Sequence, residues 1–305
     1  MPSFWTDLAG GTVGGVIGMG AVFPLDTAKC RLQTTNKYSG MIHVLTSMAR
    51  KEGLMSWYRG LLSPVVGFGT AFAISFSSYG AASRFLQSRR QVEGIGGAGG
   101  GGGLELTLWE KSVAGSCAGI ANAPFRTVFE RVKSVMQVRV GKERRAPYSW
   151  SGACAVDLVR RREGVVMGLF RGMETTMLRE GVQCAIYYPT YAVAKDFLMP
   201  PNRTNVNVYS SIPEPALQML AGGVAGCVTW APPVYFFDVI KTRMQTAQPG
   251  VYQGSWDCLM KTLRAEGTPA LFRGLGASLL RAFPLHGLVF VGYETTIAFL
   301  EDLEA

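Results

Sequence analysis

The chain has 305 residues, of which 48% are hydrophobic and 17% charged, and its net charge is +9. So much apolar sequence excludes a disordered chain, and the low share of charged residues is typical of a membrane protein, because soluble domains carry about 25%. The six cysteines stand singly and the chain has only two histidines, so neither a disulfide framework nor a metal site is predicted.

Six segments are long enough to cross a bilayer core, which takes about 20 residues. Three are free of charged residues: 8–25, 60–83 and 215–237. Three contain internal charges: 112–129 with Arg126, 175–194 with Arg179 and Glu180, and 274–293 with Arg281. A charge at membrane depth is costly unless it faces a protein interior or a water-filled cavity. Arg126, Arg179, Glu180 and Arg281 are therefore functional candidates. The alternative, a place at a helix end from which the side chain reaches the interface, fits Arg126 best, but its position one turn before Glu130 also allows it to face the cavity.

An internal repeat with a period of about 100 residues runs through the chain. In each copy an acid is followed three residues later by a lysine and seven residues later by a glutamine. The three sets are Asp26, Lys29 and Gln33; Glu130, Lys133 and Gln137; and Asp238, Lys241 and Gln245. After a short amphipathic stretch each copy has an acid–glycine pair and then an aromatic residue, arginine and glycine. These second motifs are Glu52-Gly53 with Tyr58-Arg59-Gly60, Glu163-Gly164 with Phe170-Arg171-Gly172, and Glu266-Gly267 with Phe272-Arg273-Gly274.

The three pairs of motifs resemble the mitochondrial carrier family (solute carrier family 25) over essentially the whole chain. The resemblance implies an all-α membrane protein with six transmembrane helices in three pseudo-threefold repeats, each built as helix, short matrix helix, helix. The expected parts are repeat 1 at 1–93, a Gly-rich loop at 94–103, repeat 2 at 104–200, a loop at 201–213 and repeat 3 at 214–305. Val128 and Phe236 replace the motif proline, with Pro124 and Pro232 one turn earlier, so displaced kinks are expected.

Two gates follow from the resemblance. In the family's arrangement Asp26 pairs with Lys133, Glu130 with Lys241 and Asp238 with Lys29, which closes the matrix end of a central cavity. The alternative is that these are ordinary ion pairs without a gating role. The glutamines Gln33, Gln137 and Gln245 are expected to brace the pairs. The cytoplasmic gate is expected to be weak, because its motif is reduced to Tyr79, Tyr191, Lys195, Tyr293 and Glu294.

A substrate site is predicted on the even-numbered spans. Eight residues beyond the arginines of the second motifs stand Gly67, Arg179 and Arg281. Guanidinium groups clamp a carboxylate, and Glu180 supplies the counter-charge for an amine, so a zwitterion satisfies both. Trp230 and Tyr187 offer aromatic faces for a quaternary ammonium.

This combination resembles the branch of carriers for carnitine, acylcarnitines and basic amino acids. It implies a carnitine/acylcarnitine antiporter that works by alternating access. A carrier of a basic amino acid such as ornithine, lysine or arginine is the alternative. Phe23 departs from the acylcarnitine carriers, which have histidine there, and the extra cation Arg126 is not explained by the resemblance.

No nucleophile–histidine constellation is present, so neither an enzyme nor a cofactor is predicted. The basic stretches 139–145 and 160–162 flank predicted spans, where they are expected to contact anionic lipid such as cardiolipin rather than nucleic acid. We expect a functional monomer in the mitochondrial inner membrane, with both termini facing the intermembrane space. A non-transporting membrane scaffold is the alternative from another functional class.

Overall fold

The computed structural model describes residues 4–35, 37–92, 106–138, 148, 150–160, 168–199, 214–230, 232–248 and 250–281, with seven further positions between 284 and 299. Every regular element within them is a helix. The long helices are α1 (Phe4–Thr34), α3 (Leu62–Val92), α4 (Leu108–Val138), α7 (Met173–Leu198), α8 (Glu214–Thr229) and α9 (Pro232–Thr246). The short ones are α2 (Met41–Glu52), η1 (Leu54–Tyr58), α5 (Ser151–Leu158), α10 (Ser255–Glu266) and η3 (Thr268–Phe272). Residues 275–281 are also helical.

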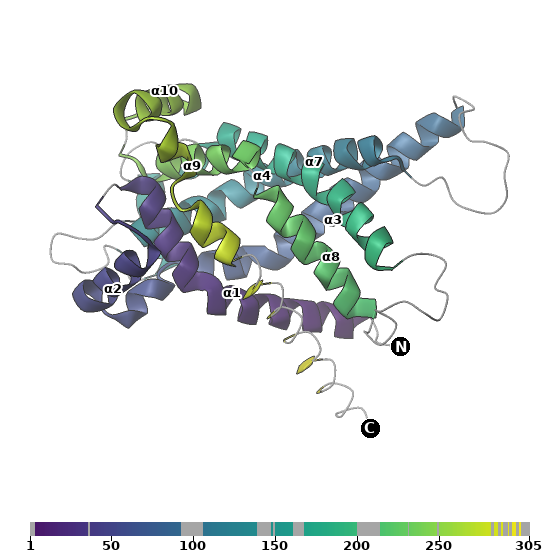
Figure 1. Cartoon of the computed structure of the whole chain (residues 1–305), viewed down its shortest axis with the longest axis horizontal. Coiled ribbons are helices and arrows are strands. Elements are labelled where there is room, and N and C mark those ends of the chain that lie inside the picture. The colour runs from purple at the N-terminus through teal and green to yellow at the C-terminus, as the bar shows by residue number, and fades with distance from the viewer. Residues whose placement is uncertain are drawn as a thin grey trace.

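The long helices run alongside one another as a bundle (Figure 1). The short helices α2 and α10 lie at one end of it, on the left of the view, and α1 begins at the opposite end (Figure 1). In the middle of the chain α4 contacts both α3 and α7, and α7 packs against α8. The described elements therefore follow the predicted order of long helix, short helix and long helix.

The membrane-crossing potential of the described helices is weaker than the sequence predicts. Among the described residues, the segment Leu54–Val92 is the one unbroken stretch long and apolar enough to cross a bilayer, and the pair α8 and α9 qualifies together. α4 and α7 carry Arg126, Arg179 and Glu180 within their length, which lowers their hydropathy. Length and composition thus support fewer spans than the expected six.

The segment 215–237, predicted as one span, is broken. α8 ends at Thr229 and α9 begins at Pro232, and the two helices are bent by 71° relative to each other. Prolines at 232 and 233 lack the backbone N–H groups that would continue the helix. The break therefore falls at the displaced proline of the third repeat, whereas Pro124 of the second repeat lies inside the continuous helix α4.

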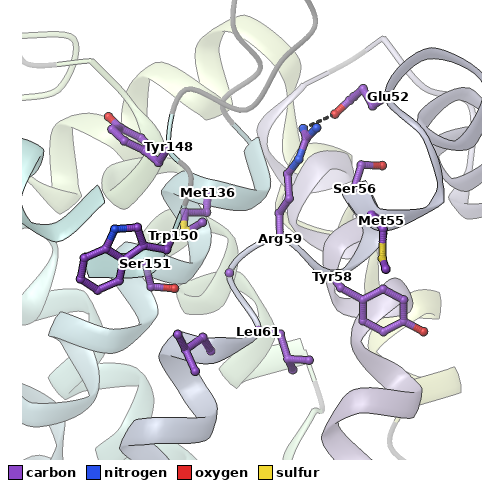
Figure 2. Close-up of a pocket in the computed structure, with 12 residues that line it drawn as sticks. Glu52, Met55, Ser56, Tyr58, Arg59, Leu61, Met136, Tyr148, Trp150 and Ser151 are labelled. Atoms are coloured by element: carbon purple, nitrogen blue, oxygen red, sulfur yellow. Dashed lines mark hydrogen bonds and ion pairs between the residues drawn. The ribbon is translucent and has the colours of Figure 1, made fainter. Parts of the chain in front are cut away.

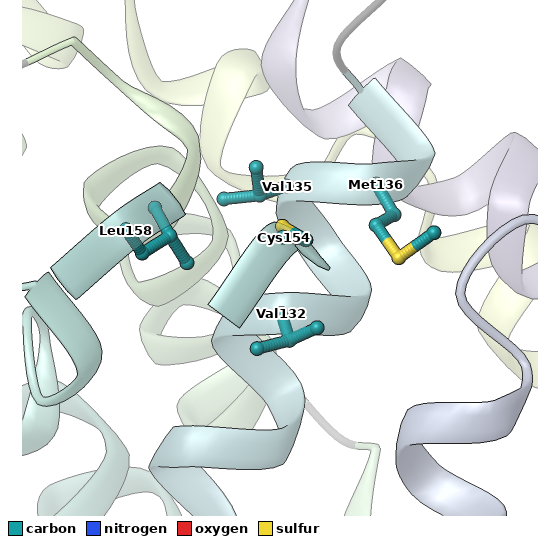
Figure 3. Packing of buried hydrophobic residues seen from close by; sticks show 5 residues of the cluster. All are labelled: Val132, Val135, Met136, Cys154 and Leu158. Atoms are coloured by element: carbon teal, nitrogen blue, oxygen red, sulfur yellow. The ribbon is translucent and has the colours of Figure 1, made fainter. Parts of the chain in front are cut away.

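Each short helix buries an apolar face against the end of a long one. Figure 3 shows the second copy, in which Cys154 and Leu158 of α5 pack on α4. The three clusters are Ala28, Val44 and Met48; Val132, Val135, Met136, Cys154 and Leu158; and Ile240, Met244, Cys258 and Leu271. Full burial of one such side chain stabilises a fold by about 1.5–3 kcal/mol. The three copies of the sequence repeat thus build three equivalent packing units.

Two charged clamps fix the short helices further. In the first, both Glu52 oxygens accept from Arg31, at 2.5 and 2.9 Å, and Arg59 donates to the same carboxylate at 2.6 Å. In the third repeat Arg243 and Arg273 hold Glu266 in the same way. Burial raises the pKa of Glu52, but the hydrogen bonds and charges of Arg31 and Arg59 lower it more, so this pKa lies below its ordinary value of 4.5. The clamp is therefore fully charged at neutral pH.

Replacing Glu52 by Gln should lower the free energy of unfolding by about 3 kcal/mol, because two nearly buried guanidinium groups lose their counter-charge. The matched control is Asp257→Asn, which breaks the exposed pair with Lys261 and should change stability by less than about 1 kcal/mol. Thermal unfolding in detergent measures both, and equal effects of the two substitutions would contradict the clamp.

Candidate functional site

Three ion pairs join α1, α4 and α9 at the end of the bundle where the short helices lie. Lys133 Nζ lies 2.6 Å from Asp26 Oδ2, and Lys29 Nζ lies 2.8 Å from Asp238 Oδ2. The third pair joins Lys241 and Glu130. Each pair links two different helices, so the three pairings predicted from the repeat are the ones formed. These six residues are called the ion-pair ring below.

Aromatic rings support two of the ring lysines. The Lys29 ammonium lies 4.2 Å from the centre of the Trp230 ring, and that of Lys133 lies 5.0 Å from the Phe23 ring. Phe23 is fully buried and Trp230 is nearly so. An ammonium over an aromatic face gains about 0.5–2 kcal/mol, more when it is desolvated. Phe23, which departs from the acylcarnitine carriers, thus supports Lys133, and the face of Trp230 is turned toward cations of the protein itself.

The glutamine braces are formed unequally. Gln33 Nε2 donates to Asp238 Oδ2 at 2.9 Å and to the Tyr235 hydroxyl at 3.0 Å, as a brace should. Gln137 Nε2 instead donates to Thr27 Oγ1, beside Asp26, at 3.1 Å. The amide of Gln245 is buried and makes no hydrogen bond to any described residue, so the brace predicted there is absent. By the pattern of Gln33, the carboxylate that Gln245 would brace is that of Glu130, the partner of Lys241. The Glu130 oxygens already accept from Lys241, Arg179 and Arg126.

The charged residues predicted for the substrate site adjoin the ring directly. Arg179 pairs with its neighbour Glu180, and its Nη2 also lies 3.1 Å from Glu130 Oε1. Arg281 Nη1 lies 2.9 Å from Asp26 Oδ1, and its guanidinium lies 5.5 Å from the Trp230 ring centre. The side chains of Arg179 and Glu180 are only 3% and 2% exposed. The two arginines found by counting therefore bind two different ring carboxylates.

Arg126, expected at a helix end, belongs to the same group of charges. Its Nη1 lies 3.0 Å from Glu180 Oε2 and its Nη2 lies 3.4 Å from Glu130 Oε1. The expectation that it reaches toward the membrane interface is wrong, because two carboxylates hold it. Glu130 stands four residues away on the same helix, which the sequence reveals, whereas Glu180 is 54 positions away and no local pattern reveals that contact.

Gly67 and Tyr187 lie beside this group rather than within it. A Cβ at Gly67 would lie 2.9 Å from Cγ of Phe129, the residue before Glu130, so this glycine allows α3 to pack closely on α4. The Tyr187 ring stacks on Tyr191 with 6.2 Å between centres and meets Tyr188 edge-on. A substrate contact of Gly67, Tyr187 or Trp230 stays a prediction.

The residues predicted for the second gate are described in part. Tyr79 of α3 stacks on Tyr188 of α7 with ring centres 4.0 Å apart, and Lys195 is exposed. Tyr293 and Glu294 lie outside the described residues, so the pair Lys195–Glu294 stays a prediction. Tyr79, an aromatic residue of the reduced gate motif, thus packs on a tyrosine outside the motif.

A second threefold set of contacts escaped the sequence reasoning. Arg31 Nε donates to the Gln137 carbonyl and Arg243 Nε donates to the Gln33 carbonyl, each at 2.9 Å. Arg131 donates to the Gln245 carbonyl and closes the circle. Each bond satisfies a carbonyl in the last turn of a neighbouring helix, where cations also meet the negative end of the helix dipole. The sequence does not show this set as a repeat, because the spacing differs between copies. Arg31 and Arg243 stand five residues after the repeat acids Asp26 and Asp238, whereas Arg131 directly follows Glu130.

A pocket of about 570 Å³ lies between the first two repeats. Figure 2 shows Arg59 and Tyr58 on one side of it and Trp150, Ser151 and Met136 on the other. The starts of α3 and α5 meet there, and the pair of Arg59 with Glu52 lies beside apolar side chains such as Leu61 and Met136. Of the basic stretches predicted to touch lipid, 139–145 and 161–162 lie outside the described residues, and Arg160 is exposed.

Comparison with known proteins gives a consistent result. The model of the mitochondrial carrier protein family matches residues 1–90, 104–202 and 213–303. The human mitochondrial carnitine/acylcarnitine carrier protein is 31% identical over 96% of this chain and 93% of its own length. The mouse protein of the same name is also 31% identical, over 94% and 92%. A mitochondrial arginine transporter of Arabidopsis thaliana is 30% identical over 97% and 91%.

A methyl group at position 67 tests the packing beside Glu130. Gly67→Ala should destabilise the protein by about 1–3 kcal/mol, because Phe129 must move to admit the new Cβ. Gly69→Ala on the same helix is the control, since a Cβ there meets nothing within 4 Å. Thermal unfolding in detergent compares the two, and a Gly67→Ala variant as stable as the control would contradict the close contact.

Proposed function

This chain belongs to the mitochondrial carrier family, whose members are transporters and not enzymes, and we propose that it is an antiporter of the mitochondrial inner membrane. The proposed spans are α1, α3, α4, α7, the bent pair α8–α9 and the helix that begins at residue 275. They form repeats at 1–93, 104–200 and 214–305, with loops at 94–103 and 201–213. The ion-pair ring faces the matrix, and both termini face the intermembrane space.

The direct contact between the substrate-site arginines and the ring carries the proposal. Arg281 binds Asp26 and Arg179 binds Glu130, and both carboxylates also hold ring lysines. A substrate carboxylate that takes either guanidinium competes with a ring carboxylate for it. Binding therefore changes the charge around the ring, and the free energy gained from substrate offsets the pairs that break when the matrix side opens.

Two buried donors support an anionic group on the substrate. Nε of Arg179 and Nε of Arg281 are buried and make no hydrogen bond to any described residue. A buried donor without an acceptor is unfavourable by about 1–3 kcal/mol. A carboxylate bound by the two arginines satisfies both, which fits the substrate-binding set proposed from the sequence.

The proposed substrate is a zwitterion, carnitine or an acylcarnitine, exchanged by alternating access. The human and mouse carnitine/acylcarnitine carriers among the relatives support this choice. The Arabidopsis arginine transporter favours the second candidate, a basic amino acid. We rank it second because arginines outnumber carboxylates at the site. On the opposite side, the tyrosines together with Lys195 and Glu294 form a weaker gate than the ring.

Cardiolipin is the proposed lipid partner of a functional monomer. The pocket of Figure 2 supports it, since Arg59 and the start of α5 suit a phosphate and Met136, Leu61 and Leu62 suit acyl chains. No nucleic acid is proposed as a partner, because the basic stretches flank spans.

Arg281→Ala should reduce carnitine exchange in proteoliposomes to background, because one guanidinium of the substrate clamp is lost. Arg281→Lys should recover little of it, since an ammonium keeps the charge without the bidentate geometry. Arg50→Ala on the exposed face of α2 is the control and should exchange normally.

Thermal unfolding in detergent must show that both Arg281 variants are folded. Full exchange by folded Arg281→Ala contradicts the proposed site. A non-transporting scaffold would exchange none of carnitine, acylcarnitines, ornithine, lysine and arginine.

A further inference from the structure

Glu180 is held by two arginines from different helices. One carboxylate oxygen accepts from Arg179, its neighbour on α7, and the other lies 3.0 Å from Nη1 of Arg126 on α4. The Glu180 side chain is 2% exposed, whereas that of Arg126 is 37% exposed. Arg126 is therefore the more exposed of the two partners of Glu180, and a cation that takes this oxygen has to displace it.

The helix crossing fixes this arrangement. A Cβ at Gly115 would lie 2.6 Å from the Cys184 carbonyl, so α4 and α7 approach closely. Ser116 Oγ donates to the Gly181 carbonyl at 3.2 Å, immediately beside Glu180. Because the backbones of α4 and α7 lie this close together, the side chain of Arg126 on α4 is long enough to reach Glu180 on α7.

The balance of charge around the site follows from Arg126. The described residues of the connected group are six cations, Lys29, Lys133, Lys241, Arg126, Arg179 and Arg281, and four carboxylates, Asp26, Glu130, Glu180 and Asp238. Since the ring pairs neutralise one another, two positive charges remain. Without Arg126 the excess falls to one, and Glu180 gains a free oxygen.

We propose that Arg126 sets the charge class of the transported substrate: by occupying Glu180 it rejects substrates with a net positive charge and reserves the site for zwitterions and anions. In this inference Arg126, and not the amine of the substrate, neutralises Glu180, which replaces the role expected of Glu180 from the sequence. This inference rests on the proposed transport function. It makes Arg126 a residue that determines specificity, and it gives a physical reason for ranking basic amino acids below carnitine.

The test measures the ratio of lysine exchange to carnitine exchange in proteoliposomes. Wild type should favour carnitine, and Arg126→Gln and Arg126→Met should raise the ratio at least about tenfold, because Glu180 becomes available to an ammonium group. Arg126→Lys keeps the charge and should retain the wild-type ratio. Lys111→Gln, which removes a cation from the same helix outside the charged group, is the matched control.

A double variant separates the action through Glu180 from a general loss of charge. Arg126→Gln combined with Glu180→Gln should lose the gained preference for lysine, since no carboxylate remains to attract it. An unchanged ratio in folded Arg126→Gln and Arg126→Met, or a wild type that prefers lysine, overturns the inference. Persistence of the gain in the double variant also overturns it.

A binding readout distinguishes this outcome from failure of the proposed transport. The shift in Tm caused by lysine and by carnitine is measured for the same variants in detergent. Lysine should stabilise Arg126→Gln and leave wild type unchanged. Absence of exchange in wild type contradicts the proposed function, whereas lysine shifts that are equal in wild type and Arg126→Gln contradict the role of Arg126.

Discussion

Pairing between lysines and carboxylates on different helices is the constraint around which this bundle is organised. Three such pairs join the ends of α1, α4 and α9, and each of the three links two different helices. Isolated charges would be unfavourable at this depth, so each helix needs the next one to neutralise it. The short helices, the charged clamps and the arginine bonds to neighbouring carbonyls all lie at this same end.

The proposed substrate site and the ring share carboxylates, and in the proposed mechanism this sharing connects substrate binding with the change of conformation. Asp26 binds both Lys133 and Arg281, and Glu130 binds both Lys241 and Arg179. A ligand that draws either arginine away changes the strength of a ring pair without touching a ring lysine. A substrate can thereby shift the equilibrium between the two open conformations, provided that it binds the closed intermediate between them more tightly than either open one.

Much of this arrangement could be predicted from the sequence because it repeats. One lysine–acid spacing, seen three times, indicated the family, and the resemblance to that family implied the three pairs. Counting from the second motifs led to Arg179 and Arg281. The remainder depends on contacts between residues far apart in the chain. The contact of Arg126 with Glu180 could not be predicted because Glu180 lies on another helix, and the Gln245 brace is absent because Lys241, Arg179 and Arg126 already hold the Glu130 oxygens.

A double-mutant cycle between Asp26 and Lys133 tests the ring most directly. Asp26→Asn and Lys133→Met are compared singly and together by thermal unfolding in detergent, with Asp257→Asn, outside the charged group, and Lys133→Met as the control pair. The account predicts a coupling on the order of 1–3 kcal/mol for Asp26 with Lys133, and additive effects within about 0.5 kcal/mol for the control. Additive effects of Asp26→Asn and Lys133→Met would contradict it.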